Sequence, residues 1–315
     1  MKLNETAAGV YAIAATPFDP AGNIDRASVD RMMDFYIGCG VTGLTILGVM
    51  GEAPKLDGEE ALALTRQVVA KAGALPIIVG VSAPGFAAMR ALARGAMEIG
   101  AAGVMIAPPS NLRADEQIIG YYRLAAAAIG EDIPFVIQDY PLTFQVVMTP
   151  RVIREIVREL PSCVMLKHED WPGLEKISAL RSFQAEGSMR PISILCGNGG
   201  LFLDFEMERG ADGAMTGYAF PDMLVDVVRL SRAGERQKAH DLFDAHLPLL
   251  RYEQQAGVGL AVRKYVLQRR GAIAFDAQRA PAAGLSARAK AEVDFLLERL
   301  ARVDARAAPR MNAAE

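Results

Sequence analysis

The sequence predicts a TIM (β/α)8 barrel with a C-terminal helical appendage, and three observations lead to this fold class. Eight short β-rich runs alternate with alanine-rich stretches of helical period from residue 10 to about residue 232. No linker rich in Pro, Gly or Ser divides this part of the 315-residue chain, and its hydrophobic content of 51% supplies a large core. Beyond residue 232 the pattern is helical throughout. We therefore expect a barrel over 1–232, C-terminal helices over 233–303 and a flexible tail over 304–315.

The predicted strands are short apolar runs, and polar residues or glycines follow several of them. In chain order they are 11–16, 43–47, 76–81, 104–107, 135–138, 163–167, 192–196 and 213–216. Apolar residues at helical spacing predict helices over 26–37, 59–72, 86–99, 116–129, 150–159 and 174–183. The same spacing predicts the C-terminal helices 235–250, 252–269 and 287–300.

Charge and hydropathy exclude two classes of partner. A net charge of -3 and a pI near 5.8 give no electrostatic footprint for nucleic acid. No apolar run approaches the roughly 20 residues of a membrane span, and residues 1–8 lack the order of a signal peptide. We expect no membrane partner and a cytoplasmic location.

Cysteines, histidines and a basic cluster are interpreted as structural. The cysteines and histidines lack metal-ligand spacing, so we expect buried thiols and no metal; they are Cys39, Cys163, Cys196, His168, His240 and His246. Near the C-terminal end lies a basic cluster that is typical of a solvated helix face: Arg263, Lys264, Arg269 and Arg270.

Lys167 is the main candidate for a functional residue because it ends the apolar run 163–166. Burial disfavours the charged form of an ammonium group, so its pKa falls and the neutral amine becomes a nucleophile toward carbonyl carbon. Lys167 is therefore a candidate for Schiff-base formation. The alternative is an ordinary lysine that reaches solvent at a strand end.

Strand alternation supplies a partner for this amine. Lys167 and Glu169 should project to the same side, about 6 to 7 Å apart along the strand, while His168 turns toward the helices. Glu169 is accordingly our candidate for a general base, and its alternative role is an ion-pair partner of the lysine. On the fifth strand the same rule places Gln138 and Tyr140 on one face. Both can donate hydrogen bonds to substrate oxygens, although Tyr140 could equally pack on the barrel rim.

These strand-end residues carry a family resemblance that extends from Gly9 to about Leu300. The chain resembles the superfamily of dihydrodipicolinate synthase and N-acetylneuraminate lyase, whose members form a Schiff base on a lysine of a TIM barrel. The features that carry the resemblance are Thr16-Pro17-Phe18, Gly22-Asn23-Ile24-Asp25, the turn Gly48-x-x-Gly51-Glu52, Gly103, Pro108, Pro141, Lys167 and Gly197.

Departures from the family pattern reduce the number of family reactions that we expect this chain to catalyse. Val49 and Met50 occupy places where family members usually carry hydroxyl residues, and Gln138 stands where they carry a proton-shuttling tyrosine. Thr143 lies near the position of the arginine that binds a second carboxylate in dihydrodipicolinate synthases. Ser110 lies near that of a tyrosine lent to a neighbouring subunit. These departures argue against a synthase of lysine biosynthesis.

The remaining pair, Lys167 and Glu169, resembles the 2-keto-3-deoxy sugar acid dehydratase branch, in particular L-2-keto-3-deoxyarabonate dehydratase. That resemblance implies a 2-oxo acid substrate, no cofactor, and a homotetramer or homodimer. Backbone N-H groups of residues 48–51, with Thr16 nearby, are candidates for binding the substrate carboxylate. The full set of expected substrate-contacting residues is Thr16, Gly48, Val49, Met50, Gly51, Gln138, Tyr140, Gly197 and Asn198.

Two other functions fit the same residues. An aldolase or synthase of the superfamily, which forms or condenses pyruvate as dihydrodipicolinate synthase does, would share Lys167. The aldolase would use Tyr140 as the base on the C4 hydroxyl of its substrate. A barrel that only binds a ligand would explain Val49 and Met50 as a loss of catalytic hydroxyls.

Overall fold

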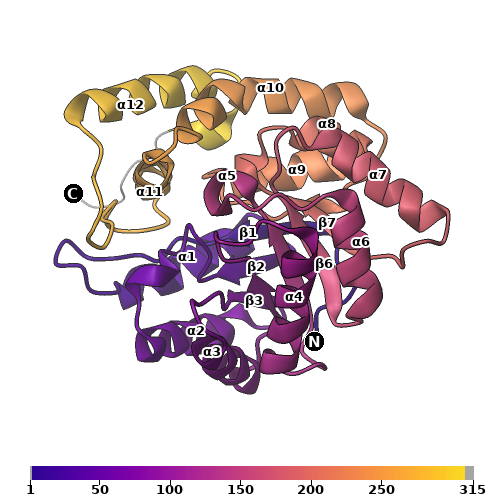
Figure 1. Ribbon diagram of the computed structural model, residues 1–315. Helices are drawn as coiled ribbons and strands as arrows, with labels where there is room; N and C mark the ends of the chain where they lie inside the picture. The colour runs from indigo at the N-terminus through magenta and orange to yellow at the C-terminus, as the bar shows by residue number, and fades with distance from the viewer. Residues whose placement is uncertain (1, 309–315) are drawn as a thin grey trace.

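A closed barrel of eight parallel strands forms the centre of the protein, as described by a computed structural model over residues 2–308 (Figure 1). Each strand pairs with its neighbours in sequence, and the last strand pairs with the first. The strands are β1 (Gly9–Ile13), β2 (Gly43–Ile46), β3 (Ile77–Gly80), β4 (Gly103–Ile106), β5 (Phe135–Asp139), β6 (Cys163–His168), β7 (Ser193–Cys196) and β8 (Gly213–Ala214). The predicted fold class is confirmed.

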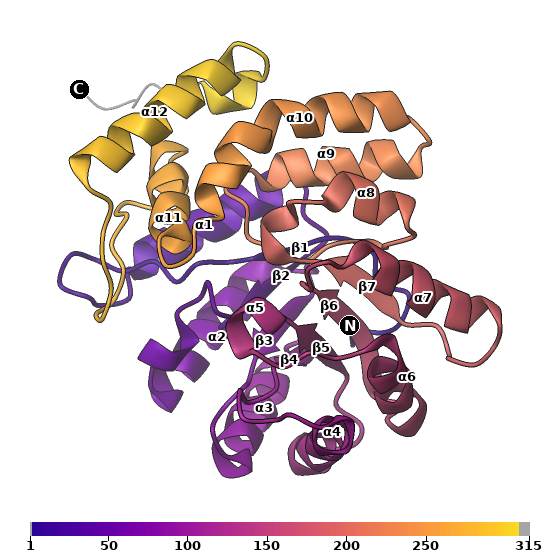
Figure 2. The ribbon, with the colours of Figure 1, turned by 45° about the horizontal axis from the view of Figure 1, so that its top comes forward.

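Helices surround the strands, as Figure 2 shows. Those that match the predicted ranges are α1 (Arg26–Gly38), α2 (Gly58–Ala72), α3 (Phe86–Ile99), α4 (Asp115–Ile129), α6 (Pro150–Glu159) and α7 (Leu174–Ala185). Capping residues start two of them: Asp57 forms a capping box with Glu60 at α2, and the Thr149 hydroxyl accepts from Val152 N-H at α6. Three further helices were not predicted individually, namely α5 (Pro141–Phe144), α8 (Leu203–Glu208) and α9 (Pro221–Arg232).

The C-terminal helices are α10 (Arg236–Glu253), α11 (Gly259–Arg269) and α12 (Ala287–Ala301), and they lie along one end of the barrel (Figure 1). The predicted helix 252–269 begins later, at Gly259. Gly257 takes a left-handed φ of +79°, and a Cβ at Gly259 would come within 2.3 Å of the Glu253 carbonyl oxygen. The turn between α10 and α11 therefore needs both glycines.

The basic cluster on and after α11 is mostly buried, so the predicted solvated face is wrong for three of its four residues. The buried ones pair with acids outside the cluster: Arg263 with Glu253, Lys264 with Glu52, and Arg270 with Asp222. Only the side chain of Arg269 is substantially exposed, at 46%. These pairs compensate the desolvation of the cations and fix α11 across the mouth of the barrel.

Residues 304–307, the first part of the predicted tail, are structured. Asp304 lies 2.9 Å from Nε2 of the buried His246, and residues Ala305–Ala307 form a 3-10 turn. Residues 309–315 of the predicted tail lie outside the described residues. Within residues 2–308, no helix is both long and apolar enough to cross a membrane.

The barrel interior and the helix layer have separate apolar clusters. Met165 belongs to the cluster inside the barrel, whereas Leu166 packs with the helices. Leu3 joins the interior cluster, and its N-H donates to the Ala102 carbonyl. Alternation from Met165 therefore directs the next odd-numbered residue of β6, Lys167, into the barrel.

Candidate active site

Lys167 lies at the carboxyl end of β6, inside the barrel and 5% exposed. Its neighbours in the sheet register are Gln138 on β5 and Leu195 on β7. Leu195 belongs to the apolar cluster inside the barrel, so the aliphatic part of the Lys167 side chain starts beside apolar residues. The predicted burial of this amine is confirmed.

Glu169 projects into the same hollow. Its backbone N-H donates to the Asp139 carbonyl at 2.9 Å, so strand pairing continues one residue beyond β6. The carboxylate is 5% exposed, and its Oε2 lies 2.9 Å from Nζ of Lys167. An amine and a carboxylate are thus in contact in a dry site, where a nucleophile and a base could act on adjacent atoms.

Two further donors hold the Glu169 carboxylate. Gln138 Nε2 donates to Oε2 at 2.9 Å, and the Asn198 backbone N-H donates to Oε1 at 3.0 Å. Gly197 makes room for the carboxylate, because a Cβ at that position would lie 2.3 Å from Glu169 Cγ. The loop after β7 therefore fixes the orientation of a group carried by β6.

His168 and Asp139 face the helices, as alternation predicts. His168 is fully buried next to Gly173, where an added Cβ would lie 2.4 Å from its Nε2. Asp139 Oδ2 lies 2.8 Å from Nζ of Lys176 on α7. Neither residue reaches the hollow that contains Lys167.

A cavity of about 70 Å³ opens above Lys167 and Glu169. Of the residues predicted to contact substrate, five line it: Val49, Met50, Gln138, Tyr140 and Asn198. The lining also includes residues that were not predicted, namely Ile13, Gly199, Thr216, Gly217, Gln254 and Arg263. Thr16, Gly48, Gly51 and Gly197 lie outside the lining.

The turn at residues 48–51 presents two backbone donors to this region. Among the described residues, the N-H groups of Val49 and Met50 have no hydrogen-bond partner. The Gly51 N-H is already bonded to the Gly48 carbonyl at 3.0 Å, so it is not one of the expected anion donors. The Thr16 hydroxyl donates to the Gly51 carbonyl at 2.6 Å and is buried, which fixes the turn in place.

Arg263 and Gln254 reach the cavity from the C-terminal helices. Arg263 Nε donates to the buried Glu253 carboxylate at 2.5 Å, and burial raises the pKa of Glu253. Gly217 accommodates the guanidinium, because a Cβ there would lie 2.4 Å from Arg263 Nη1. In the sequence, the signal for the Arg263 contact is the basic cluster at 263–270. Helical periodicity alone predicts that such a cluster lies on a solvated face.

Tyr140 lies on the same side as Gln138, as predicted, and packs edge-on against Phe144 with ring centroids 6.2 Å apart. Burial raises the pKa of its phenol, and the nearby Glu169 acts in the same direction. The phenol is therefore a hydrogen-bond donor at neutral pH.

Comparison with known proteins gives consistent matches over almost the whole chain. The model of the dihydrodipicolinate synthetase family matches residues 6–300. The L-2-keto-3-deoxyarabonate dehydratase of Azospirillum brasilense is 30% identical over 297 residues, which are 93% of this chain and 94% of that protein. A protein of Escherichia coli (strain K12) named "probable 2-dehydro-3-deoxy-D-pentonate aldolase YjhH" is 26% identical, over 82% of this chain and 90% of its own.

A solved structure is more similar still. A crystal structure described as dihydrodipicolinate synthase from Rhodopseudomonas palustris is 66% identical in sequence, with a TM-score of 0.94. The match covers 95% of this chain and 99% of that one. The names of these three relatives describe three different reactions.

Proposed function

This chain belongs to the dihydrodipicolinate synthetase family, a family of lyases, and within it we propose that the protein dehydrates a 2-keto-3-deoxy sugar acid such as L-2-keto-3-deoxyarabonate. The observation that carries this proposal is the contact of 2.9 Å between Lys167 Nζ and Glu169 Oε2 in a closed site. Gln138 stands beside the lysine in the sheet register, and an amide cannot shuttle protons as a phenol does.

The reaction begins at Lys167. Its neutral amine adds to the C2 carbonyl of the substrate, and loss of water gives an iminium ion. The positive nitrogen withdraws electrons, so a proton on C3 becomes acidic. In the adduct C3 is two bonds from Nζ, or about 2.5 Å away, which brings its hydrogens within reach of Glu169.

Glu169 then acts as base and acid in turn. Its Oε2 removes the C3 proton to give an enamine, and the enamine electrons expel the C4 hydroxyl, which takes the same proton and leaves as water. Hydrolysis of the unsaturated iminium frees Lys167 and releases an oxo-acid that keeps every carbon of the substrate. The loss is one water in total.

The remaining lining residues bind the substrate. The free N-H groups of Val49 and Met50 are suited to its carboxylate, because uncharged donors bind a small anion effectively in a dry pocket. Gln138, Tyr140 and Asn198 are suited to the hydroxyls further along the chain. Glu253 balances the charge of Arg263, so Arg263 adds hydrogen-bond donors to the cavity without adding net charge.

A product assay tests the proposal. The purified protein is incubated with 2-keto-3-deoxy acids derived from pentoses and hexoses, and the products are identified by mass spectrometry. An oxo-acid lighter than its substrate by one water supports the dehydratase.

An aldolase is the second candidate, because Tyr140 lines the same cavity and could act on the C4 hydroxyl. Pyruvate together with an aldehyde in that assay would replace the dehydratase by this function. If neither product nor a covalent adduct with Lys167 formed, the barrel would be a ligand-binding protein.

A further inference from the structure

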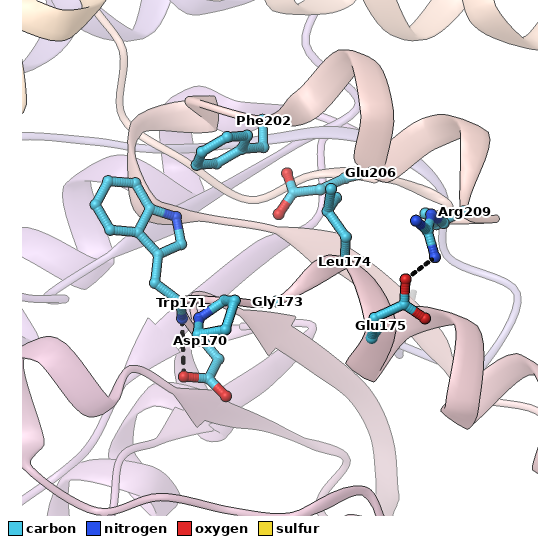
Figure 3. Close-up of a pocket in the computed structure, with 9 residues that line it drawn as sticks. Asp170, Trp171, Gly173, Leu174, Glu175, Phe202, Glu206 and Arg209 are labelled. Carbon is cyan, nitrogen blue, oxygen red and sulfur yellow. Dashed lines mark hydrogen bonds and ion pairs between the residues drawn. The ribbon is translucent and has the colours of Figure 1, made fainter.

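A second, larger cavity opens on the helix side of β6 and β7 and shares no lining residue with the cavity at Lys167. Its volume is about 610 Å³, and Figure 3 shows its walls. One wall is the loop after Glu169 with the start of α7, and the other is the segment around α8. The lining consists of Asp170, Trp171, Pro172, Gly173, Leu174, Glu175, Phe202, Glu206 and Arg209.

Two aromatic rings form the outer part of this cavity. Trp171 and Phe202 pack edge to face, with ring centroids 5.5 Å apart and an interplanar angle of 78°. Each remains about 40% exposed, at 41% and 40%. Aromatic surface that stays open beside a cavity is suited to an apolar or cationic ligand.

Glu206 supplies a buried carboxyl group to the same cavity. The residue is only 7% exposed, and Figure 3 shows its carboxylate turned toward Trp171 and Phe202. Among the described residues, its Oε2 has no hydrogen-bond partner. The Cys196 thiol is hydrogen-bonded to this carboxyl group, which leaves one of its oxygens without a partner. A buried oxygen without a partner is costly unless a donor or cation binds there.

The other charged groups of the lining are already paired. Arg209 Nη1 lies 2.7 Å from Glu175 Oε1, and Asp170 Oδ2 lies 2.5 Å from Lys176 Nζ. The nearest cation of the lining is therefore held away from Glu206, as the dashed line in Figure 3 indicates.

We propose that this cavity binds a small organic cation, a primary or quaternary ammonium compound, with its charge at Glu206 and its apolar part against Trp171 and Phe202. A carboxylate and two aromatic faces both attract an ammonium group, and the apolar walls exclude inorganic cations that need several oxygen ligands. The inference does not rest on the proposed function, because none of the residues that line this cavity lines the cavity at Lys167.

Binding of such a cation should depend on pH. Burial raises the pKa of Glu206 to about 7. The titratable groups that face it are His168, Glu169, Cys196 and Asp204. His168 and the Cys196 thiol lower this pKa, and the two other carboxylates raise it. Because the cation pairs with the ionised form, its affinity should rise about tenfold per pH unit below 7 and level off above.

Trp171 makes the test direct, because it is the only tryptophan of the chain. Its fluorescence is titrated with choline, and in parallel with 3,3-dimethylbutan-1-ol, in which carbon replaces the ammonium nitrogen. We expect saturable binding of choline and an affinity for the neutral alcohol that is about tenfold lower or weaker. Glu206→Gln, which keeps the shape of the side chain, should weaken choline binding by a similar factor.

Matched variants separate this site from its surroundings. Phe202→Ala should weaken binding, whereas Phe205→Ala should not, because Phe205 is 44% exposed on α8, which follows Phe202, but lies outside the lining. Lys167→Ala should bind choline as the unaltered protein does. Thermal unfolding of Glu206→Gln verifies that the variant is folded.

Three results would overturn the inference. They are equal binding of choline and its neutral analogue, unchanged affinity in Glu206→Gln, and absence of any saturable signal. If Trp171 fluorescence instead changes with protein concentration while choline has no effect, a second copy of the chain covers the cavity.

Discussion

Glu206→Gln should stabilise the protein at alkaline pH, and the size of the effect follows from the burial of this carboxyl group. Its pKa is about 7 in the folded protein, against an ordinary value of 4.5. At about 1.4 kcal/mol per pH unit, that difference corresponds to about 3 kcal/mol. The residue is 7% exposed, so solvent screening reduces this value little.

Proton binding by Glu206 determines whether the free energy of unfolding rises or falls with pH. The folded state keeps the Glu206 proton up to pH 7, whereas the unfolded chain loses it near pH 4.5. The favourable contribution is thus complete below pH 4.5 and is lost as pH rises to 7. Glutamine does not titrate, so the free energy of unfolding of the variant minus that of the unaltered protein should increase by about 2 to 3 kcal/mol between pH 5 and pH 8.

Urea unfolding of both proteins at equal concentration, at pH 5, 6, 7 and 8, measures this difference. Glu208→Gln is a matched control on the same helix, because Arg236 lowers the pKa of Glu208 and moves its effect below this pH window. A constant difference between Glu206→Gln and the unaltered protein from pH 5 to pH 8 would refute the assignment of a desolvated, protonated carboxyl to Glu206.

Three other substitutions test the remaining contacts. Glu169→Gln should retain the adduct at Lys167 and lower turnover by about 10² to 10⁴-fold, measured by steady-state kinetics and borohydride trapping; full turnover would exclude Glu169 as the base. Gly197→Ala should displace the Glu169 carboxylate, since its Cβ would lie 2.3 Å from Cγ, and should lower turnover more than adduct formation; kinetics like those of the unaltered protein would contradict this packing. Glu52→Gln should lower stability by about 3 to 5 kcal/mol in urea unfolding, because the fully buried Lys264 loses its counter-charge; an unchanged midpoint would show that the pair is not needed.

The contact between Lys167 and Glu169 was predictable from the sequence because its geometry is local. Lys167 and Glu169 lie two residues apart on one strand, and strand alternation alone places both side chains on one side. Their burial follows from the apolar run before them. The same rule correctly turned His168 and Asp139 toward the helices.

Contacts between distant segments were not predictable in this way. Arg263 and Gln254 reach the cavity only because a turn with two glycines redirects the chain between α10 and α11. The basic cluster looked like a surface because its cations are buried by acids outside the cluster, among them Glu52, which lies 212 residues from Lys264 in the chain. Helix α8, which carries Glu206, has six residues and is too short to show a helical period.

The most direct test of the central claim is reduction with borohydride in the presence of L-2-keto-3-deoxyarabonate, followed by peptide mass spectrometry. The account predicts one covalent adduct, on the peptide that contains Lys167, and none in Lys167→Ala. Turnover of the substrate without an adduct at Lys167, or with an adduct at another lysine, would contradict it.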